Sequence, residues 1–249
     1  MITSPAASLI WLVVSLVFFL VVQRWLHQEI QILFYLLTRR INLALTLFAL
    51  LFLPGVLLHE TSHFLVARLL GVRTRRFSLI PQVTVDARLR LGYVETAQVD
   101  VLRDTLIGAA PLLIGGAVVA YLGIYQLGIA PLFSLASQGN WDQLWAALGA
   151  LPDHPDFWLW FYLTFTISSM MMPSPSDRQA WLPVILVVVF LAGLALLAGA
   201  GTWMIENMAP GLEQVVGSIA TVFGISLVLH LALGVPVGIL RLVLSKLAR

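Results

Sequence analysis

The chain contains no cysteine, and only 10% of its 249 residues are charged. The lack of cysteine excludes disulfides and thiolate ligands or nucleophiles, so any bound metal must be held by His, Asp or Glu. Lysine is almost as scarce, since 13 of the 14 positive residues are arginines spread over several segments. A net charge of +2 without a dense basic patch gives no support for nucleic-acid binding.

Apolar residues make up 60% of the chain, and the mean hydropathy is +0.96. Because an average soluble domain is about 25% charged, this composition indicates an all-α polytopic membrane protein, with residues 1–249 as a single membrane domain. A membrane span needs about 20 apolar residues. This rule predicts about six helices, near residues 6–26, 41–70, 105–125, 156–172, 181–204 and 215–245.

Three local features refine this helix assignment. The segment before residue 6 has no Lys or Arg and no Ala-x-Ala site follows it, so we expect a retained helix and not a cleaved signal peptide. Residues 27–40 have a polar start and an apolar centre, which suit an interfacial or re-entrant piece. Pro54-Gly55 can kink the second helix.

Arginine placement predicts the orientation in the bilayer. The connection 71–104 is rich in arginine, whereas 126–155 and 205–214 have no Lys or Arg, so the first is expected in the cytoplasm and the other two outside. Arg24, Arg39 and Arg40 would then lie outside, against this rule. The larger difference in arginine content between the connections still favours this orientation. Aromatic residues between 140 and 162 suit a belt at the outer interface or ordinary aromatic packing.

Between the second and third helices the pattern changes to alternating apolar and polar residues. Residues 76–80, 82–85 and 89–96 are rich in β-branched and aromatic side chains and are separated by Pro81 and Gly92. This predicts a small membrane-associated β-hairpin or sheet at the inner face; an irregular charged loop is the alternative.

The second helix carries His59-Glu-Thr-Ser-His63, a His-Glu-x-x-His zinc signature. Residues four apart on a helix lie about 5 to 6 Å apart at Cβ, so both imidazoles can bind one metal. Glu60 can then act as the general base toward a water on that metal. A chance match is disfavoured, since ionisable groups near the bilayer centre cost about 2.5 to 3.5 kcal/mol each.

The third ligand is expected from Asp177. Pro173 and Pro175 forbid regular helix after residue 172 and favour extended backbone, which brings the following carboxylate toward the second helix. A carboxylate completes the three protein ligands that a catalytic zinc usually has and leaves one position open. The alternative is a solvated loop acid paired with Arg178.

Other ionisable residues have simpler explanations. Asp100 and Asp104 suit the N-terminus of the third helix, where a carboxylate complements the helix dipole. Glu206 and Glu213 are expected outside, far from the inner site. His230 is expected to be a hydrogen-bonded structural residue, with a fourth ligand or a substrate-gate residue as the alternative.

These motifs resemble the site-2 protease family of intramembrane zinc metalloproteases. The resemblance spans about residues 41–180 and rests on His59–His63, on the 71–79 and 92–95 stretches, and on Met172-Pro-Ser-Pro-Ser-Asp177. It implies zinc binding by His59, His63 and Asp177, a general base at Glu60, and cleavage of unwound transmembrane helices. Met170 and Arg178 stand where that family has Asn and Gly, and the connections are too short for a PDZ domain, which indicates a divergent minimal member.

The expected function is therefore hydrolysis of peptide bonds in transmembrane or membrane-adjacent proteins, with about one zinc ion per chain, in a prokaryotic plasma membrane. The active site is expected in the cytoplasmic half of the bilayer. One alternative is another membrane zincin that cuts at the cytoplasmic face with Glu206 or Glu213 as third ligand. A second alternative is a metal transporter or a non-catalytic metal-binding scaffold.

Overall fold

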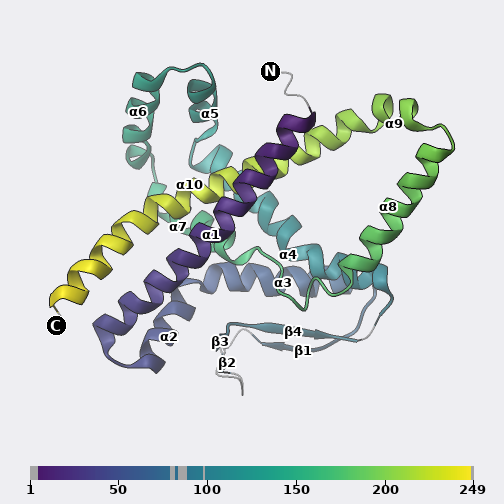
Figure 1. Cartoon of the computed structure of the whole chain (residues 1–249). Helices are drawn as coiled ribbons and strands as arrows, with labels where there is room; N and C mark the ends of the chain where they lie inside the picture. Colours follow the sequence, from purple (N-terminus) through teal and green to yellow (C-terminus); the bar gives the residue numbers. More distant parts are fainter. Residues whose placement is uncertain (1–4, 79–81, 84–88, 98, 248–249) are drawn as a thin grey trace.

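A computed structural model describes residues 5–78, 82–83, 89–97 and 99–247 (Figure 1). Its longest elements are α1 (Pro5–Thr38) and α10 (Ala209–Leu247), which lie side by side along much of their length. Arg241 on α10 donates two hydrogen bonds to the buried Glu29 carboxylate on α1, at 2.6 and 3.0 Å. This bidentate pair joins the first and last helices without leaving a buried charge unpaired.

Within the described ranges, three helices are long and apolar enough to cross a membrane: residues 7–38, 101–126 and 209–247. Two bent helix pairs raise the number to five if each is one span. The all-α, membrane-compatible architecture is thus confirmed, whereas six separate spans are not. The first helix also continues without a break to Thr38, so most of residues 27–40 is not the separate interfacial or re-entrant piece expected from sequence.

The predicted helix 41–70 is broken into α2 (Ile41–Leu51) and α3 (Leu53–Leu69), which meet at 65°. The break lies just before Pro54, whose missing N–H removes a helical partner from the preceding turn. Pro54 leaves the Leu50 carbonyl without a donor four residues later, and at the end of α2 Tyr162 donates its hydroxyl to the neighbouring Leu51 carbonyl at 2.9 Å. The kink expected at Pro54-Gly55 is therefore found, and a side chain from another helix satisfies the exposed backbone.

The middle of the chain forms α4 (Val101–Tyr121), which continues as a π-helical turn η1 (Leu122–Gln126). Residues 126–155, expected as a loop, contain the helical hairpin α5 (Ala130–Ser137) and α6 (Trp141–Ala150) and the short η2 (Leu151–Asp153). They lead to α7 (Phe157–Met170), and exposed Trp141, Trp145 and Trp158 lie in this region. Asp100 accepts a hydrogen bond from the Arg103 backbone N–H, which lowers its pKa and confirms its role as the N-cap of α4.

After α7 the chain has no regular helix until α8 (Trp181–Leu197), which turns by 118° into α9 (Gly201–Asn207). Met171 to Ala180 contain no regular helix, as the two prolines predict, but residues 175–180 form turns and not the extended backbone expected from sequence. Thr105 on α4 donates its hydroxyl to the carbonyl of Ala180 at 3.1 Å. The segment that carries Asp177 is thus tied to α4.

The predicted hairpin is present beneath α3 (Figure 1). Strand β1 (Thr74–Ser78) pairs antiparallel with β4 (Tyr93–Thr96), and β2 (Gln82–Val83) pairs with β3 (Leu89–Arg90). Residues 79–81 and 84–88, which the sequence placed in or between strands, lie outside the described part.

Helix α3 lies against α4 and α7 at the centre of the molecule. At Gly55 the α7 backbone comes so close that a Cβ would lie 2.1 Å from the Thr166 carbonyl oxygen. Only glycine permits this approach. It fixes the start of α3 against α7, one turn before His59.

Candidate metal centre

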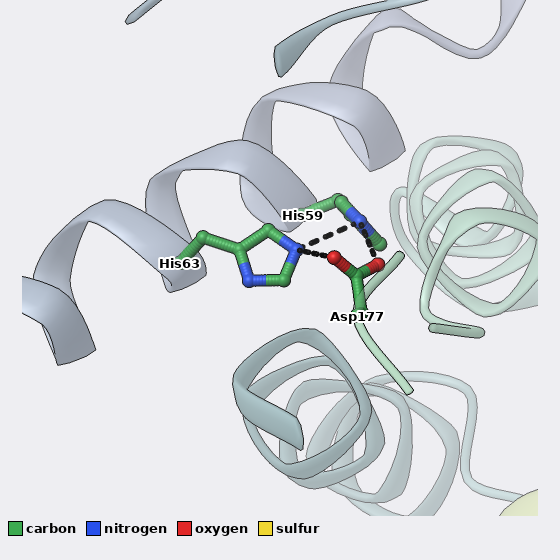
Figure 2. Close-up of side chains that lie close together, drawn as sticks. All are labelled: His59, His63 and Asp177. Atoms are coloured by element: carbon green, nitrogen blue, oxygen red, sulfur yellow. Dashed lines mark hydrogen bonds and ion pairs between the residues drawn. The ribbon is translucent and has the colours of Figure 1, made fainter. Parts of the chain in front are cut away.

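His59 and His63 project from successive turns of α3 toward Asp177, which comes from the segment after α7 (Figure 2). The two imidazole Nε2 atoms are 3.2 Å apart. The Asp177 carboxylate oxygens lie 3.5 Å from His63 Nε2 and 3.9 Å from His59 Nε2. The side chains of His59, His63 and Asp177 are only 15%, 8% and 17% exposed.

Both imidazoles are oriented by backbone carbonyls. His59 Nδ1 is 2.7 Å from the Met170 oxygen, and His63 Nδ1 is 2.8 Å from the Ile107 oxygen. A carbonyl only accepts, so each Nδ1 carries the proton and each Nε2 lone pair faces the other ligands. Histidines that bind a metal are typically held in this way, with the second ring nitrogen donating to a fixed acceptor.

Sequence explains why these two carbonyls are free. Pro111 has no N–H, so the Ile107 carbonyl four residues earlier lacks its partner within α4. Met170 is the last residue of α7, where carbonyls have no helical partner. The acceptors that orient the histidines could therefore have been sought among carbonyls without a helical partner, at helix ends and four residues before prolines.

Asp177 is held by a local motif. Its Oδ2 accepts the Ser174 backbone N–H at 2.7 Å, while its own N–H donates to Ser174 Oγ at 3.3 Å. This reciprocal pair is the geometry of a capping box, here Ser-Pro-Ser-Asp with proline in the first position of the turn. The carboxylate is fixed by one oxygen, and its other oxygen faces His63.

Gly108 lets this segment reach the histidines. A Cβ at Gly108 would lie 2.0 Å from the Asp177 carbonyl oxygen. The backbone of Asp177 therefore rests directly on α4, one residue after the carbonyl that orients His63. A side chain at this position would displace the carboxylate.

The donor atoms fit a zinc ion. Tetrahedral ligands about 2.1 Å from a metal are about 3.4 Å from one another. The observed separations of 3.2, 3.5 and 3.9 Å bracket that spacing. Among the described residues, one group of His, Asp and Glu side chains has donor atoms close enough to bind a single metal ion. It consists of His59, His63 and Asp177.

No family model, curated protein or solved structure matches this chain. The case for the site therefore rests on its own geometry.

Glu60 is buried on α3 beside this group. It lines a cavity of about 420 Å³ together with the three candidate ligands, residues of β4, and Ser174 and Ser176. We call this cavity the ligand chamber. It provides open space beside the candidate metal position.

The structure brings together all four predicted site residues, His59, Glu60, His63 and Asp177. Glu206 and Glu213 lie on α9 and α10 and are not part of the group. Asp104 begins α4 as expected, but it also lines the ligand chamber, which sequence reasoning missed.

His230 is fully buried, with both ring nitrogens hydrogen-bonded. Its Nε2 is 2.8 Å from Ser169 Oγ, and its Nδ1 is 2.7 Å from the Ser226 oxygen. These partners are those of a structural histidine that joins α10 to α7. It is not among the three candidate ligands.

Gly108→Ala should weaken metal binding at this candidate site about 10- to 100-fold, with zinc as the probe, since the methyl group must push Asp177 away from the imidazoles. Gly116→Ala on the same helix is the matched control, because its Cβ would meet only Val222 Cγ1 at 3.9 Å. Titration of both purified variants against a zinc chelator measures the difference. Equal affinities would contradict the assigned role of the Gly108 contact.

Proposed function

We propose that this protein is a zinc metalloprotease that hydrolyses peptide bonds of transmembrane or membrane-adjacent proteins, similar to the site-2 protease family. The observation that carries the proposal is the convergence of His59 Nε2, His63 Nε2 and the Asp177 carboxylate, with Glu60 beside them. Two histidines and one carboxylate leave an open position on zinc, as catalytic sites require.

His59, His63 and Asp177 would hold the zinc ion. A zinc ion held there would act as a Lewis acid toward the scissile carbonyl and would lower the pKa of a bound water toward about 7. Glu60 takes the proton of the attacking water and then delivers it to the leaving amide nitrogen as the C–N bond breaks. One peptide bond and one water thus give a carboxylate and an amine.

The substrate is proposed to bind as an extended strand. Tyr93, Val94 and Thr96 of β4 line the ligand chamber from one side, and Ser174 and Ser176 line it from another. An extended peptide can pair its backbone with a strand of this kind. A transmembrane helix must unwind to adopt this form, which exposes its amide bonds for cleavage.

Arginine in the hairpin region supports a cytoplasmic position for β1 and β4, and so for the half of α3 that carries the site. We place the protein in a prokaryotic plasma membrane, with a role in regulated intramembrane proteolysis. The apolar long helices support the membrane assignment.

Removal and return of zinc tests this function. Purified protein in lipid vesicles should cleave a model transmembrane substrate, lose activity after treatment with a chelator, and recover it when about one equivalent of zinc is added. A protein that binds zinc but cleaves no membrane substrate, and whose cellular function survives loss of Glu60, would instead be a metal transporter or scaffold.

A further inference from the structure

A second cavity of about 380 Å³ adjoins the ligand chamber. The two cavities share His59, Glu60 and Gly92. Gly92 lies against Glu60, since a Cβ there would be 2.8 Å from Glu60 Cγ. The proposed catalytic carboxylate therefore lies where the two cavities meet.

The wall of this second cavity contains two polar residues from one face of α1. Gln23 and His27 are four residues apart, so they occupy successive turns of that helix. Gln23 donates its amide to the Ser169 carbonyl at 2.5 Å and so fixes α1 to the end of α7. Pro173 cannot donate to that carbonyl, which leaves it free for Gln23.

His27 has an unsatisfied ring nitrogen. Its Nε2 is buried and has no hydrogen-bond partner among the residues that the structure describes. The ring packs edge-on against Phe48 and Phe52, at centroid distances of 5.6 and 4.8 Å, and these two rings also contact each other. An unpaired polar group within a membrane helix is costly, and such groups usually serve a function.

The substrate of the proposed protease needs hydrogen-bond donors in the membrane. When a membrane helix unwinds, its carbonyl oxygens lose their helical partners and water is scarce around them. His27 lines the second cavity, and the torsion about its Cβ–Cγ bond is broad, so rotation of the ring can turn a nitrogen toward that cavity. A ring N–H can then face the cavity.

We infer that the second cavity is a substrate subsite in which His27 donates a hydrogen bond to an oxygen of the unwound peptide beside the scissile bond. This inference rests on the proposed proteolytic function. The oxygen is a backbone carbonyl or a side-chain oxygen of the substrate. His27 is a positioning residue, and Glu60 remains the group that moves the proton.

His27→Leu tests the inference. Leucine keeps the apolar contacts with Phe48 and Phe52 and removes the unpaired nitrogen, so the melting temperature should stay equal or rise. Zinc content should not change. With a model transmembrane substrate in vesicles, KM should rise about tenfold with kcat within about twofold, the pattern of a lost binding contact.

His27→Gln should recover most of the affinity, because its amide is also a donor. His154→Leu, in the exposed segment before α7, is the matched control and should leave KM unchanged. Substrates with leucine at single positions near the cut identify the oxygen. If one substrate substitution abolishes the KM difference between the wild type and the His27→Leu variant, the oxygen is on that side chain; if none does, it is in the backbone.

Unchanged KM in His27→Leu would overturn the inference, as would a lower melting temperature with unchanged kinetics, the result of a purely structural role. These outcomes remain distinct from failure of the proposed function. If Glu60→Gln still cleaves the substrate, the protease proposal fails; if Glu60→Gln is inactive and His27→Leu behaves as wild type, only the subsite inference fails.

Discussion

Glu60→Gln should lower the rate of peptide cleavage by about 10²- to 10⁴-fold, the contribution of a positioned general base. Glutamine has nearly the same shape but cannot accept the proton of the attacking water. Glu60 is not among the three candidate ligands, so zinc content should stay at the wild-type level. Single-turnover cleavage of a transmembrane substrate and metal analysis of the same preparation measure both effects.

Glu206→Gln is the matched control for that experiment, since Glu206 lies exposed on α9. It should retain both zinc and activity. Loss of zinc in this variant would instead favour a zincin with its third ligand on α9. Full activity in Glu60→Gln would contradict the proposed mechanism.

Asp177→Ala should reduce zinc affinity more than about 100-fold, beyond the range for loss of a residue that only orients a ligand. Two imidazoles would remain, and catalytic zinc usually has three protein ligands. Cleavage should be lost together with the metal. Competition with a chelator of known affinity measures the first effect, and the vesicle assay measures the second.

Asp104→Ala tests whether a carboxylate near the candidate metal position affects zinc affinity without being a ligand. Asp104 lines the same chamber as Asp177 but is not one of the three candidate ligands. Its loss should leave zinc affinity within about twofold of wild type, as expected for an exposed surface charge. If Asp104→Ala releases zinc and Asp177→Ala does not, the ligand assignment is wrong.

The sequence predicted which ionisable residues come together better than it predicted the helix boundaries. The spacing of His59 and His63 fixes both imidazoles on one helix face, and the prolines after α7 explain why Asp177 is not carried away in a continuing helix. The sequence could not show that Ile107 and Met170 supply the orienting carbonyls, because these contacts join residues 44 and 111 positions apart.

The helix boundaries depend on contacts between residues far apart in the sequence, which a hydropathy profile does not describe. The polar start of residues 27–40 suggested that the first span ends near residue 26, yet Glu29 in that segment and Gln23 before it each have a partner on another helix. With those groups satisfied, α1 continues to Thr38. Likewise, the bend between α2 and α3 is stabilised by Tyr162, which no local pattern links to Leu51.

X-ray absorption at the zinc edge tests the central claim most directly. The zinc-loaded protein should show two imidazole nitrogens at about 2.0 to 2.1 Å and oxygen ligands at about 2.0 to 2.2 Å. One imidazole should disappear in His59→Ala and one in His63→Ala. A spectrum without imidazole ligands, or a protein that binds no zinc at all, would contradict the account.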